Sequence, residues 1–232
     1  SIVIALATLA EYRDNDTGLH VERVTQFSTL LAEELQRHGA YRDQIDDVFI
    51  NDLRRAAPLH DIGKVAIPDA VLLKPGRLDD DEMELMRTHA AIGRNTIRSV
   101  IERSSDIGFL RMAEEITGGH HEWFDGRGYP EGMAGEAIPL SARIVAVADV
   151  YDAITSVRVY KKAMSHEKAC SIITESSGTQ FDPEIVAAFE RQAQEFERLA
   201  RELVDRPHEE HVSIPFDPGR REITDAPTRR TG

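Results

Sequence analysis

The sequence predicts an all-α fold in which a helical bundle is followed by a flexible C-terminal tail. Apolar residues recur at helical spacing along most of the 232 residues. Residues that commonly cap helices precede several of these segments. An internal stretch without helical periodicity, residues 124–139, is rich in Gly and Pro and lacks the alternation of a strand. Hydrophobic residues make up 41% and charged residues 30% of the chain, a balance typical of globular proteins.

The N-terminal part predicts three helices. Residues 2–12 are apolar and lack both a basic leader and an initiator Met, so we expect a fragment whose first helix continues from an upstream regulatory domain. A second helix is expected over 17–38, where one apolar stripe consists of Val21, Val24, Phe27, Leu31 and Leu35. A third is expected over 43–57 and ends before Pro58.

The middle of the chain predicts three further helices and a long loop. Asp79 and Glu82 have the spacing of a capping box, which starts a helix through His89. We expect a separate helix to follow it as far as about Arg103. Residues 107–121 are helical up to paired glycines and paired histidines, and the loop over 124–139 comes next.

The C-terminal part predicts three capped helices and the tail. Ser141 is expected to open a helix over 142–156, and Ser165 one over 166–176. Asp182 followed by Pro183 is expected to cap a long charged helix over 184–205. Residues 206–232 contain four prolines and few large apolar residues, which predicts a flexible tail. The chain is therefore divided into one folded domain, 1–205, and a tail, 206–232.

Charge and cysteine content exclude several classes of partner. The chain has 28 basic and 41 acidic residues, so its formal charge of −13 argues against binding duplex nucleic acid or an anionic membrane. No apolar run reaches the ~20 residues of a membrane-spanning helix. The single cysteine, Cys170, excludes an internal disulfide and indicates a reducing compartment, which we take to be the cytoplasm.

Polar residues that interrupt apolar segments are the candidates for chemistry. His60 and Asp61 lie between the apolar residues 56–59 and Ile62, and Asp149 follows the apolar run 144–148. Burying such groups costs free energy unless each one is hydrogen-bonded or binds a metal ion. A satisfied polar pair is the alternative for His60 and Asp61, and a buried, hydrogen-bonded carboxylate is the alternative for Asp149.

Further histidines and one aspartate extend this set. His20 lies on or beside the stripe of the second helix, Asp16 comes four residues earlier, and His89 has apolar neighbours. Imidazoles and carboxylates without a thiolate suit iron or manganese, and also zinc or nickel, better than calcium or magnesium. Two divalent ions would outweigh the charge of the three carboxylates Asp16, Asp61 and Asp149, and the site could then hold a phosphodiester.

Two motifs together resemble a known family. The run His60-Asp61-Ile62-Gly63-Lys64 and the run from His121 through Pro130, with further blocks in the same order over about residues 1–190, resemble the HD-GYP branch of the HD-domain phosphohydrolases. That family folds as an HD-domain helical bundle and hydrolyses the bacterial messenger cyclic di-GMP to pGpG or GMP. Its members use two or three divalent metal ions, usually iron and in some cases manganese.

The resemblance implies a set of metal ligands. His20, His60, Asp61 and Asp149 match the ligands of the wider HD superfamily, and Asp61 is expected to bridge the metals. The extra ligands of this branch match His89, His120 and His121. Asp16 stands where members with three metals commonly have Glu, so it is the candidate ligand for a third ion.

The resemblance also implies catalytic and substrate-binding residues. Asp61 and Lys64 are the expected catalytic residues, and Lys64 is expected to contact the scissile phosphate. The expected substrate-binding residues are Lys64, Arg158, Lys161, Gly128, Tyr129 and Pro130. In this family the loop that contains the last three also contacts diguanylate cyclase (GGDEF) domains. The ring of Tyr129 either stacks on a guanine or packs within the protein.

Residues 1–205 are therefore expected to form a bacterial, cytoplasmic HD-GYP catalytic domain. In the mechanism we expect, a metal-bridging hydroxide attacks phosphorus in cyclic di-GMP and the 3′ oxygen leaves. Two alternatives stay open: a phosphodiesterase for another cyclic dinucleotide such as cyclic GMP-AMP, and a poorly active metal-bound module that binds the messenger or a cyclase. The amphipathic long C-terminal helix and the apolar first helix are candidates for a homodimer interface or for a connection to an upstream sensory domain.

Overall fold

The structure is a computed structural model that describes residues 7, 10, 18–38, 41–103, 108–156 and 163–203. Several expectations lie outside these residues: most of the first helix, the tail over 206–232, and the residues Asp16, Arg158 and Lys161.

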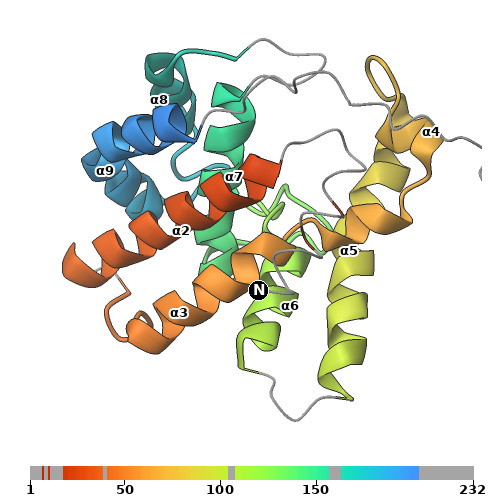
Figure 1. Cartoon of the computed structure of the whole chain (residues 1–232), viewed down its shortest axis with the longest axis horizontal. Coiled ribbons are helices and arrows are strands. Elements are labelled where there is room, and N and C mark those ends of the chain that lie inside the picture. The colour runs from red at the N-terminus through yellow and green to blue at the C-terminus, as the bar shows by residue number, and fades with distance from the viewer. Residues whose placement is uncertain are drawn as a thin grey trace, which may run out of the picture.

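The all-α prediction is confirmed. The described residues form helices joined by turns, with no strand among them (Figure 1). The α-helices are α2 (Gly18–His38), α3 (Asp47–Ala56), α4 (Asp69–Leu72), α5 (Asp80–Ile101), α6 (Gly108–Gly119), α7 (Leu140–Thr155), α8 (His166–Glu175) and α9 (Pro183–Glu202). Short 3-10 helices are η2 (Ala57–Leu59), η3 (Ile62–Ala66) and η4 (Gly135–Ala137).

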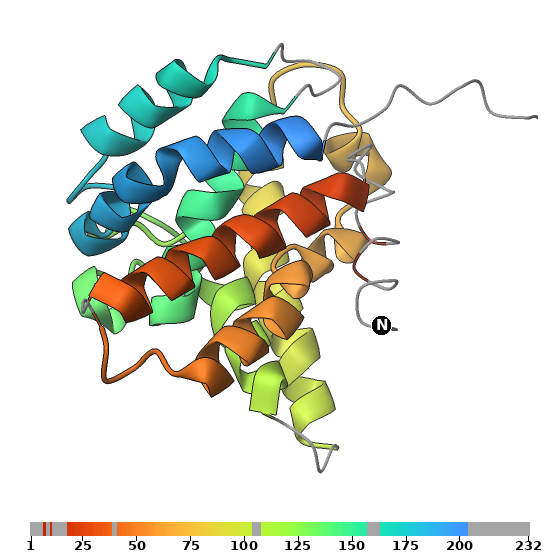
Figure 2. The ribbon, with the colours of Figure 1, turned by 60° about the vertical axis from the view of Figure 1, so that its left-hand side comes forward.

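Helix α7 is the central helix of the bundle. It packs against α2, α6, α8 and α9, and its apolar run from Ile144 to Ala148 is buried on all sides. A helix that is apolar all round is stable in water only when neighbours cover it in this way. Figures 1 and 2 show α2 and α9 running beside one another on one side of α7, with α5 on the other side.

An aromatic cluster fixes α2 against α7 and α9. The ring of Phe27 stacks on Phe196 at a centroid distance of 4.5 Å and meets Tyr151 edge-on at 5.1 Å. All three side chains are fully buried, and burial of each contributes roughly 1.5–3 kcal/mol. The cluster therefore holds in place the two helices that carry His20 and Asp149.

Several predicted helix starts are confirmed by their caps. Asp79 and Glu82 form both hydrogen bonds of the capping box at the start of α5. The side chain of Ser165 accepts from the backbone N–H of Lys168, and Asp182 accepts from that of Glu184. The apolar stripe of α2 is buried as predicted.

Three predicted helix boundaries are wrong. Residues 80–101 form one continuous helix and not two, because neither a cap nor a proline interrupts them. Helix α3 begins at Asp47, since the side chain of Asp46 accepts from Phe49 N and residues 41–44 form a turn. Helix α7 begins at Leu140 after Pro139, and Ser141 does not cap it because its hydroxyl donates to Glu115 instead.

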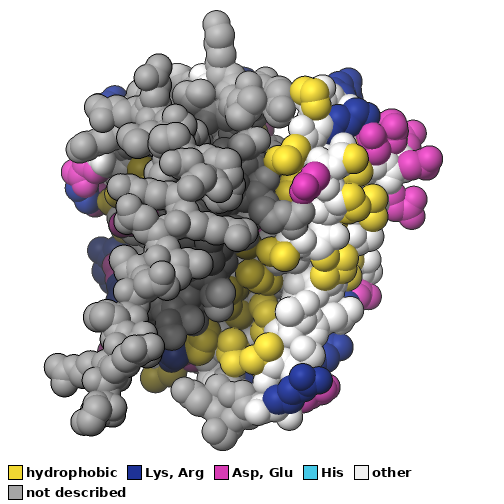
Figure 3. All heavy atoms as spheres, turned by 45° about the vertical axis from the view of Figure 1, so that its right-hand side comes forward, with side chains coloured by type: hydrophobic (Ala, Val, Ile, Leu, Met, Phe, Trp, Pro, Cys, Tyr) yellow, Lys and Arg dark blue, Asp and Glu magenta, His cyan; other side chains and the backbone are white. Residues whose placement is uncertain are grey.

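No helix in the described ranges is both long and apolar enough to cross a membrane. Some large apolar side chains are nevertheless exposed, among them Val48, Val65, Met83 and Val100. Figure 3 shows a band of hydrophobic side chains down one face. Exposed apolar residues are common on soluble domains, so the band alone assigns no partner.

Candidate metal centre

His60 and Asp61 lie in a tight turn between η2 and η3 and not on an α-helix. The backbone N–H of His60 donates to Ala57 O at 3.2 Å, and that of Lys64 donates to Asp61 O at 2.9 Å. Pro58 is the second residue of η2, where its missing N–H and fixed φ suit the first turn of a helix. Both His60 and Asp61 are buried.

Gly63 allows this turn to approach α5. A Cβ atom at Gly63 would lie 2.0 Å from the carbonyl oxygen of His89. Only glycine, which has no Cβ, avoids this clash. Since η3 packs directly on α5, Asp61 is brought beside His89. The glycine of the motif is therefore required by packing next to the site.

Asp61 and three histidines form one group of four candidate ligands, which meet near Oδ1 of Asp61. Its Oδ1 lies 3.1 Å from His89 Nε2 and 3.5 Å from His120 Nε2. The Nε2 atoms of His89 and His121 are 3.1 Å apart. One ligand atom from each of the four residues lies within 4.8 Å of the others.

A second group surrounds the other oxygen of Asp61. His20, His60 and Asp61 each offer a ligand atom within 4.8 Å of the others, and His60 Nε2 lies 3.4 Å from Asp61 Oδ2. Asp149 lies at the edge of this group, with its Oδ1 3.8 Å from His20 Nε2 and 4.0 Å from His60 Nε2. Unlike His20 and His60, Asp149 is not fully buried. Asp61 is thus the residue common to both groups.

In four of these histidines the Nδ1 atom, which faces away from the centre of the site, is hydrogen-bonded. The Nδ1 atoms of His60, His89 and His120 lie 2.8–3.0 Å from the carbonyl oxygens of Ala57, Met86 and Ile116, respectively. His20 Nδ1 lies 2.7 Å from Asp152 Oδ2. Because a carbonyl or carboxylate can only accept, each Nδ1 donates and each Nε2 keeps its lone pair for the centre of the site.

Buried polar atoms at the centre support metal binding. The Nε2 atoms of His20 and His120 and Oδ1 of Asp61 are buried and make no hydrogen bond within the described part of the chain. Leaving such atoms unsatisfied costs free energy that coordination would offset. The residues present therefore fit two divalent ions that share Asp61, and the nitrogen and oxygen donors suit first-row transition metals.

Electrostatic interactions favour the deprotonated form of most of these groups, which is the form that binds a metal ion. Burial alone would raise the pKa of Asp61, but the positive charge of Lys64 and the neighbouring imidazoles hold it well below its usual range. Burial lowers the pKa values of His120 and His121, so both imidazoles are neutral near pH 7. Metal ligands must be deprotonated, and these pKa shifts provide that state.

His20 is the exception among the imidazoles. Burial lowers its pKa, but the hydrogen bond and charge of Asp152 outweigh burial and raise it. The pKa of Asp152 falls to about 2, because His20 and Arg23 overcome the effect of its own burial. Asp152 is thus ionised at neutral pH and lies next to His20 Nδ1.

Lys64 lies at the edge of the centre. Its Nζ is 2.8 Å from Asp61 Oδ2, and its side chain is largely buried. The 3-10 turn of η3 brings Lys64 back over Asp61, three residues earlier. A cation is therefore available beside the carboxylate that both groups share.

The loop that follows the paired histidines folds back onto them. The backbone N–H of Tyr129 donates to His121 O at 3.2 Å, and its ring stacks on that of His121 at 4.7 Å. A Cβ atom at Gly128 would lie 2.2 Å from Trp123 N, so this close approach requires glycine. Pro130, next in the chain, is half-buried. The ring of Tyr129 thus packs on a candidate metal ligand, and its stacking on a guanine stays a prediction.

Sequence reasoning missed two buried carboxylates beside the site. Asp152 binds His20 and is also an acceptor for Arg23 Nε. Glu122 accepts from the backbone N–H groups of Glu131 at 2.7 Å and Gly132 at 3.1 Å. The only signals in the sequence are that Asp152 comes one helical turn after Asp149 and that Glu122 directly follows the paired histidines.

Comparison with known proteins gives one family model, described as HD domain, which matches residues 16–185. A probable cyclic di-GMP phosphodiesterase of Vibrio cholerae is 45% identical over 220 residues, covering 94% of this chain and 49% of the relative. A 3′3′-cGAMP-specific phosphodiesterase of the same organism is 36% identical, covering 88% and 37%. The chain thus spans about half the length, or less, of these relatives.

Solved structures share the fold. The crystal structure of a cyclic GMP-AMP-specific phosphodiesterase of V. cholerae matches with a TM-score of 0.61 at 21% identity, covering 87% of this chain and 50% of that one. This likeness supports the helical architecture that positions the candidate ligands.

Proposed function

The chain belongs to the HD domain family, in its HD-GYP branch, and on this premise we propose that it hydrolyses cyclic di-GMP to pGpG, GMP or both. One observation carries the proposal: Asp61 is shared by two groups of mostly buried candidate ligands, with the Lys64 ammonium 2.8 Å away. A relative named as a probable cyclic di-GMP phosphodiesterase, 45% identical over most of this chain, supports the substrate.

The proposed cofactors are two divalent ions, iron in preference to manganese. One ion would be held by His20, His60 and Asp149. The other would be held by His89, His120 and His121. Asp61 would be a ligand of both ions. When bound, such a pair of ions supplies positive charge for a phosphodiester and activates a water molecule for in-line attack. A third ion would need Asp16 as a ligand.

The residues of the chain complete the proposed chemistry. Asp61, held ionised, fixes the spacing of the two ligand groups. The Lys64 ammonium would contact a phosphate oxygen and stabilise the negative charge that develops as the 3′ oxygen leaves. Tyr129 and Gly128 would form one wall of the substrate site together with Pro130, while Arg158 and Lys161 would bind a substrate phosphate.

Cyclic GMP-AMP is the second candidate substrate. The relative named as specific for 3′3′-cGAMP is 36% identical over 88% of this chain. The two messengers share the phosphodiester chemistry and differ in one base, so the same ligand set serves either substrate. Relative kcat/KM for the two substrates decides between them.

The test is elemental analysis of anaerobically purified protein, paired with hydrolysis of cyclic di-GMP by the same sample. We expect at least two iron or manganese ions per chain and the appearance of pGpG or GMP. Three ions would support the proposed role of Asp16. Fewer than two ions and no product, even after reconstitution with iron or manganese, would contradict the proposal and favour a module that only binds the messenger or a cyclase.

A further inference from the structure

Arg87 places a guanidinium beside the metal centre that the proposed chemistry does not use. It lies on α5 two residues before His89, and its side chain is exposed. Its Cζ lies 5.2 Å from the centroid of the Tyr129 ring, which in turn stacks on His121. A single aromatic ring therefore separates the guanidinium from a candidate metal ligand.

Among the residues that the structure describes, Arg87 forms no ion pair with a carboxylate. Within the described ranges, Arg87 has no acidic group at ion-pair distance, whereas Arg94 and Arg98 on the same helix pair with Glu131 and Glu114 at 2.6 Å. The chain carries a net charge of −13, so acidic residues are abundant elsewhere. An arginine that is not ion-paired within these ranges can bind an anionic ligand.

Arg87 also borders the same space as the centre. The Tyr129 ring on which the guanidinium lies is 4.7 Å from the ring of His121 and 6.4 Å from that of His89, measured between centroids. Tyr129 thus contacts both the guanidinium and the imidazoles of the centre. The face of Tyr129 gives the guanidinium a cation–π contact, which limits its freedom before a ligand binds.

We propose that Arg87 binds the phosphodiester of the cyclic dinucleotide that is not being cleaved, an inference that rests on the proposed function. A cyclic dinucleotide carries two phosphodiesters, and only one can lie at the ligand groups and Lys64. A planar guanidinium donates two parallel hydrogen bonds to a phosphate, so Arg87 is suited to the second. Arg87 would then select substrates that carry two phosphates.

The test compares two substrates in the metal-loaded protein. Cyclic di-GMP carries both phosphodiesters, whereas bis(p-nitrophenyl) phosphate carries only the one that reacts. For Arg87→Ala we expect KM for cyclic di-GMP to rise about tenfold or more, the scale of a lost charge-assisted hydrogen bond. We expect kcat/KM for bis(p-nitrophenyl) phosphate and the metal content to stay within about twofold of wild type.

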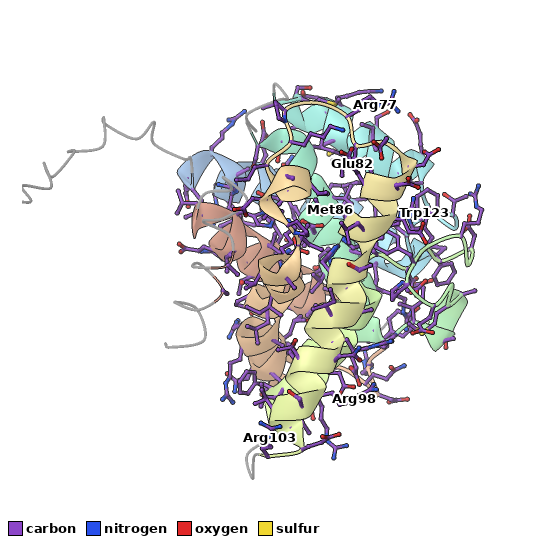
Figure 4. All side chains as sticks on the ribbon, turned by 90° about the vertical axis from the view of Figure 1, so that its right-hand side faces the viewer. Arg77, Glu82, Met86, Arg98, Arg103 and Trp123 are labelled. Carbon is purple, nitrogen blue, oxygen red and sulfur yellow. The ribbon has the colours of Figure 1, made fainter. Side chains whose placement is uncertain are left out.

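Two variants control the experiment. Arg87→Lys keeps the charge without the paired donors and should recover only part of the loss. Arg103→Ala removes the same charge beyond the far end of α5, and should leave both substrates unaffected. Figure 4 shows Arg103 at the opposite end of this helix from Met86, the neighbour of Arg87.

Each other outcome overturns the inference. An equal loss of kcat/KM for both substrates, or a loss of metal, would show that Arg87 acts through the metal centre. Unchanged kinetics for both substrates would show that the Arg87 side chain is only solvated. Binding of cyclic di-GMP and cyclic di-AMP to wild type and Arg87→Ala adds a second measurement. A loss of affinity for both ligands supports phosphate recognition, whereas a loss for cyclic di-GMP alone would show that Arg87 reads guanine.

Failure of the proposed function gives a different result. A wild-type protein that binds cyclic di-GMP without hydrolysing it would end the enzymatic proposal, yet the affinity comparison would still test Arg87. Wild type that binds neither cyclic dinucleotide would overturn both.

Discussion

His20 and Asp152, separated by 132 residues in the chain, are joined by a buried hydrogen bond of 2.7 Å from Nδ1 to Oδ2. Asp152 also accepts from both Nε and Nη2 of Arg23, and Arg23 Nη1 donates to Leu203 O at 3.0 Å. A candidate metal ligand is therefore oriented by a carboxylate that is itself fixed between α2 and the end of α9.

Asp152→Asn should weaken metal binding without abolishing folding. The amide can still accept from His20, but it lacks the negative charge that makes the imidazole a better ligand. Changes of this kind typically cost about 10–100-fold in metal affinity. Competition with a chelator measures the loss, and Asp43→Asn, an exposed change, is the control. Unchanged metal affinity would show that Asp152 serves only to pair with Arg23.

Asp152→Ala should also destabilise the fold. It leaves the guanidinium of Arg23 buried with its main ion pair removed, which typically costs about 3–5 kcal/mol. Urea unfolding of the metal-free protein measures this loss separately from metal binding. A loss no larger than that of Asp152→Asn would contradict the structural role of the ion pair.

Local rules account for much of the fold, and the long-range contacts account for the errors. The caps at Asp79, Ser165 and Asp182 were predictable, since each depends on residues two or three positions away. The failure at Ser141 has a tertiary cause, because Glu115 on another helix takes its hydroxyl. Two carboxylates compete near the start of α3, and periodicity alone did not favour Asp46 over Asp43.

The candidate site also divides into residues that are predictable from the local sequence and residues that depend on long-range contacts. His60, Asp61 and Asp149 are predictable because polar residues there interrupt apolar runs, and His20, Asp16 and His89 are predictable from their position beside apolar residues. Only the family resemblance adds His120 and His121 as ligands. Asp152 and Glu122 gave no such signal. Their partners lie on other elements or later in the loop, and only the folded chain brings them together.

Gly63→Ala should disrupt the metal centre although glycine has no side-chain functional group. The added Cβ would lie 2.0 Å from His89 O and 2.7 Å from Gly93 N, so η3 must move away from α5 and carry Asp61 with it. We expect a loss of at least about 1–3 kcal/mol in unfolding free energy, typical of overpacking, and reduced metal content. Thermal unfolding and elemental analysis measure the two effects.

Gly108→Ala is the matched control for this change. A Cβ there would lie 3.6 Å from Asp52 Oδ2, an ordinary contact, on the first residue of α6. We expect it to leave metal content unchanged and stability equal or slightly higher. Similar behaviour of the two variants would contradict the packing argument.

Substitutions at the centre should separate metal binding from turnover. His60→Ala and Asp61→Ala remove ligand atoms, so both should lower metal content and hydrolysis of cyclic di-GMP. Lys64→Ala should keep the metal and lower kcat by about 100-fold or more, the scale of losing one group that stabilises developing charge. Elemental analysis and steady-state kinetics on the same samples make the comparison. Full activity of Asp61→Ala, or loss of metal in Lys64→Ala, would contradict these roles.

Glu122→Ala should loosen the loop that carries Tyr129 while sparing the centre. It removes the acceptor for the N–H groups of Glu131 and Gly132, and burying two unsatisfied donors costs about 1–3 kcal/mol each. The loop would then open to solvent, so we expect KM for cyclic di-GMP to rise and proteolysis within the loop to become faster. Metal content should stay close to wild type.

Glu122→Gln distinguishes this role from one that needs charge. Burial raises the pKa of Glu122, which shows that its surroundings penalise the ionised form. The amide oxygen of Gln can accept the same two hydrogen bonds, so KM and protease resistance should remain close to wild type. If Gln behaved like Ala, the negative charge of Glu122 would be required in place of its acceptor oxygen. If both variants lost metal, Glu122 would support the histidine pair directly and not the loop.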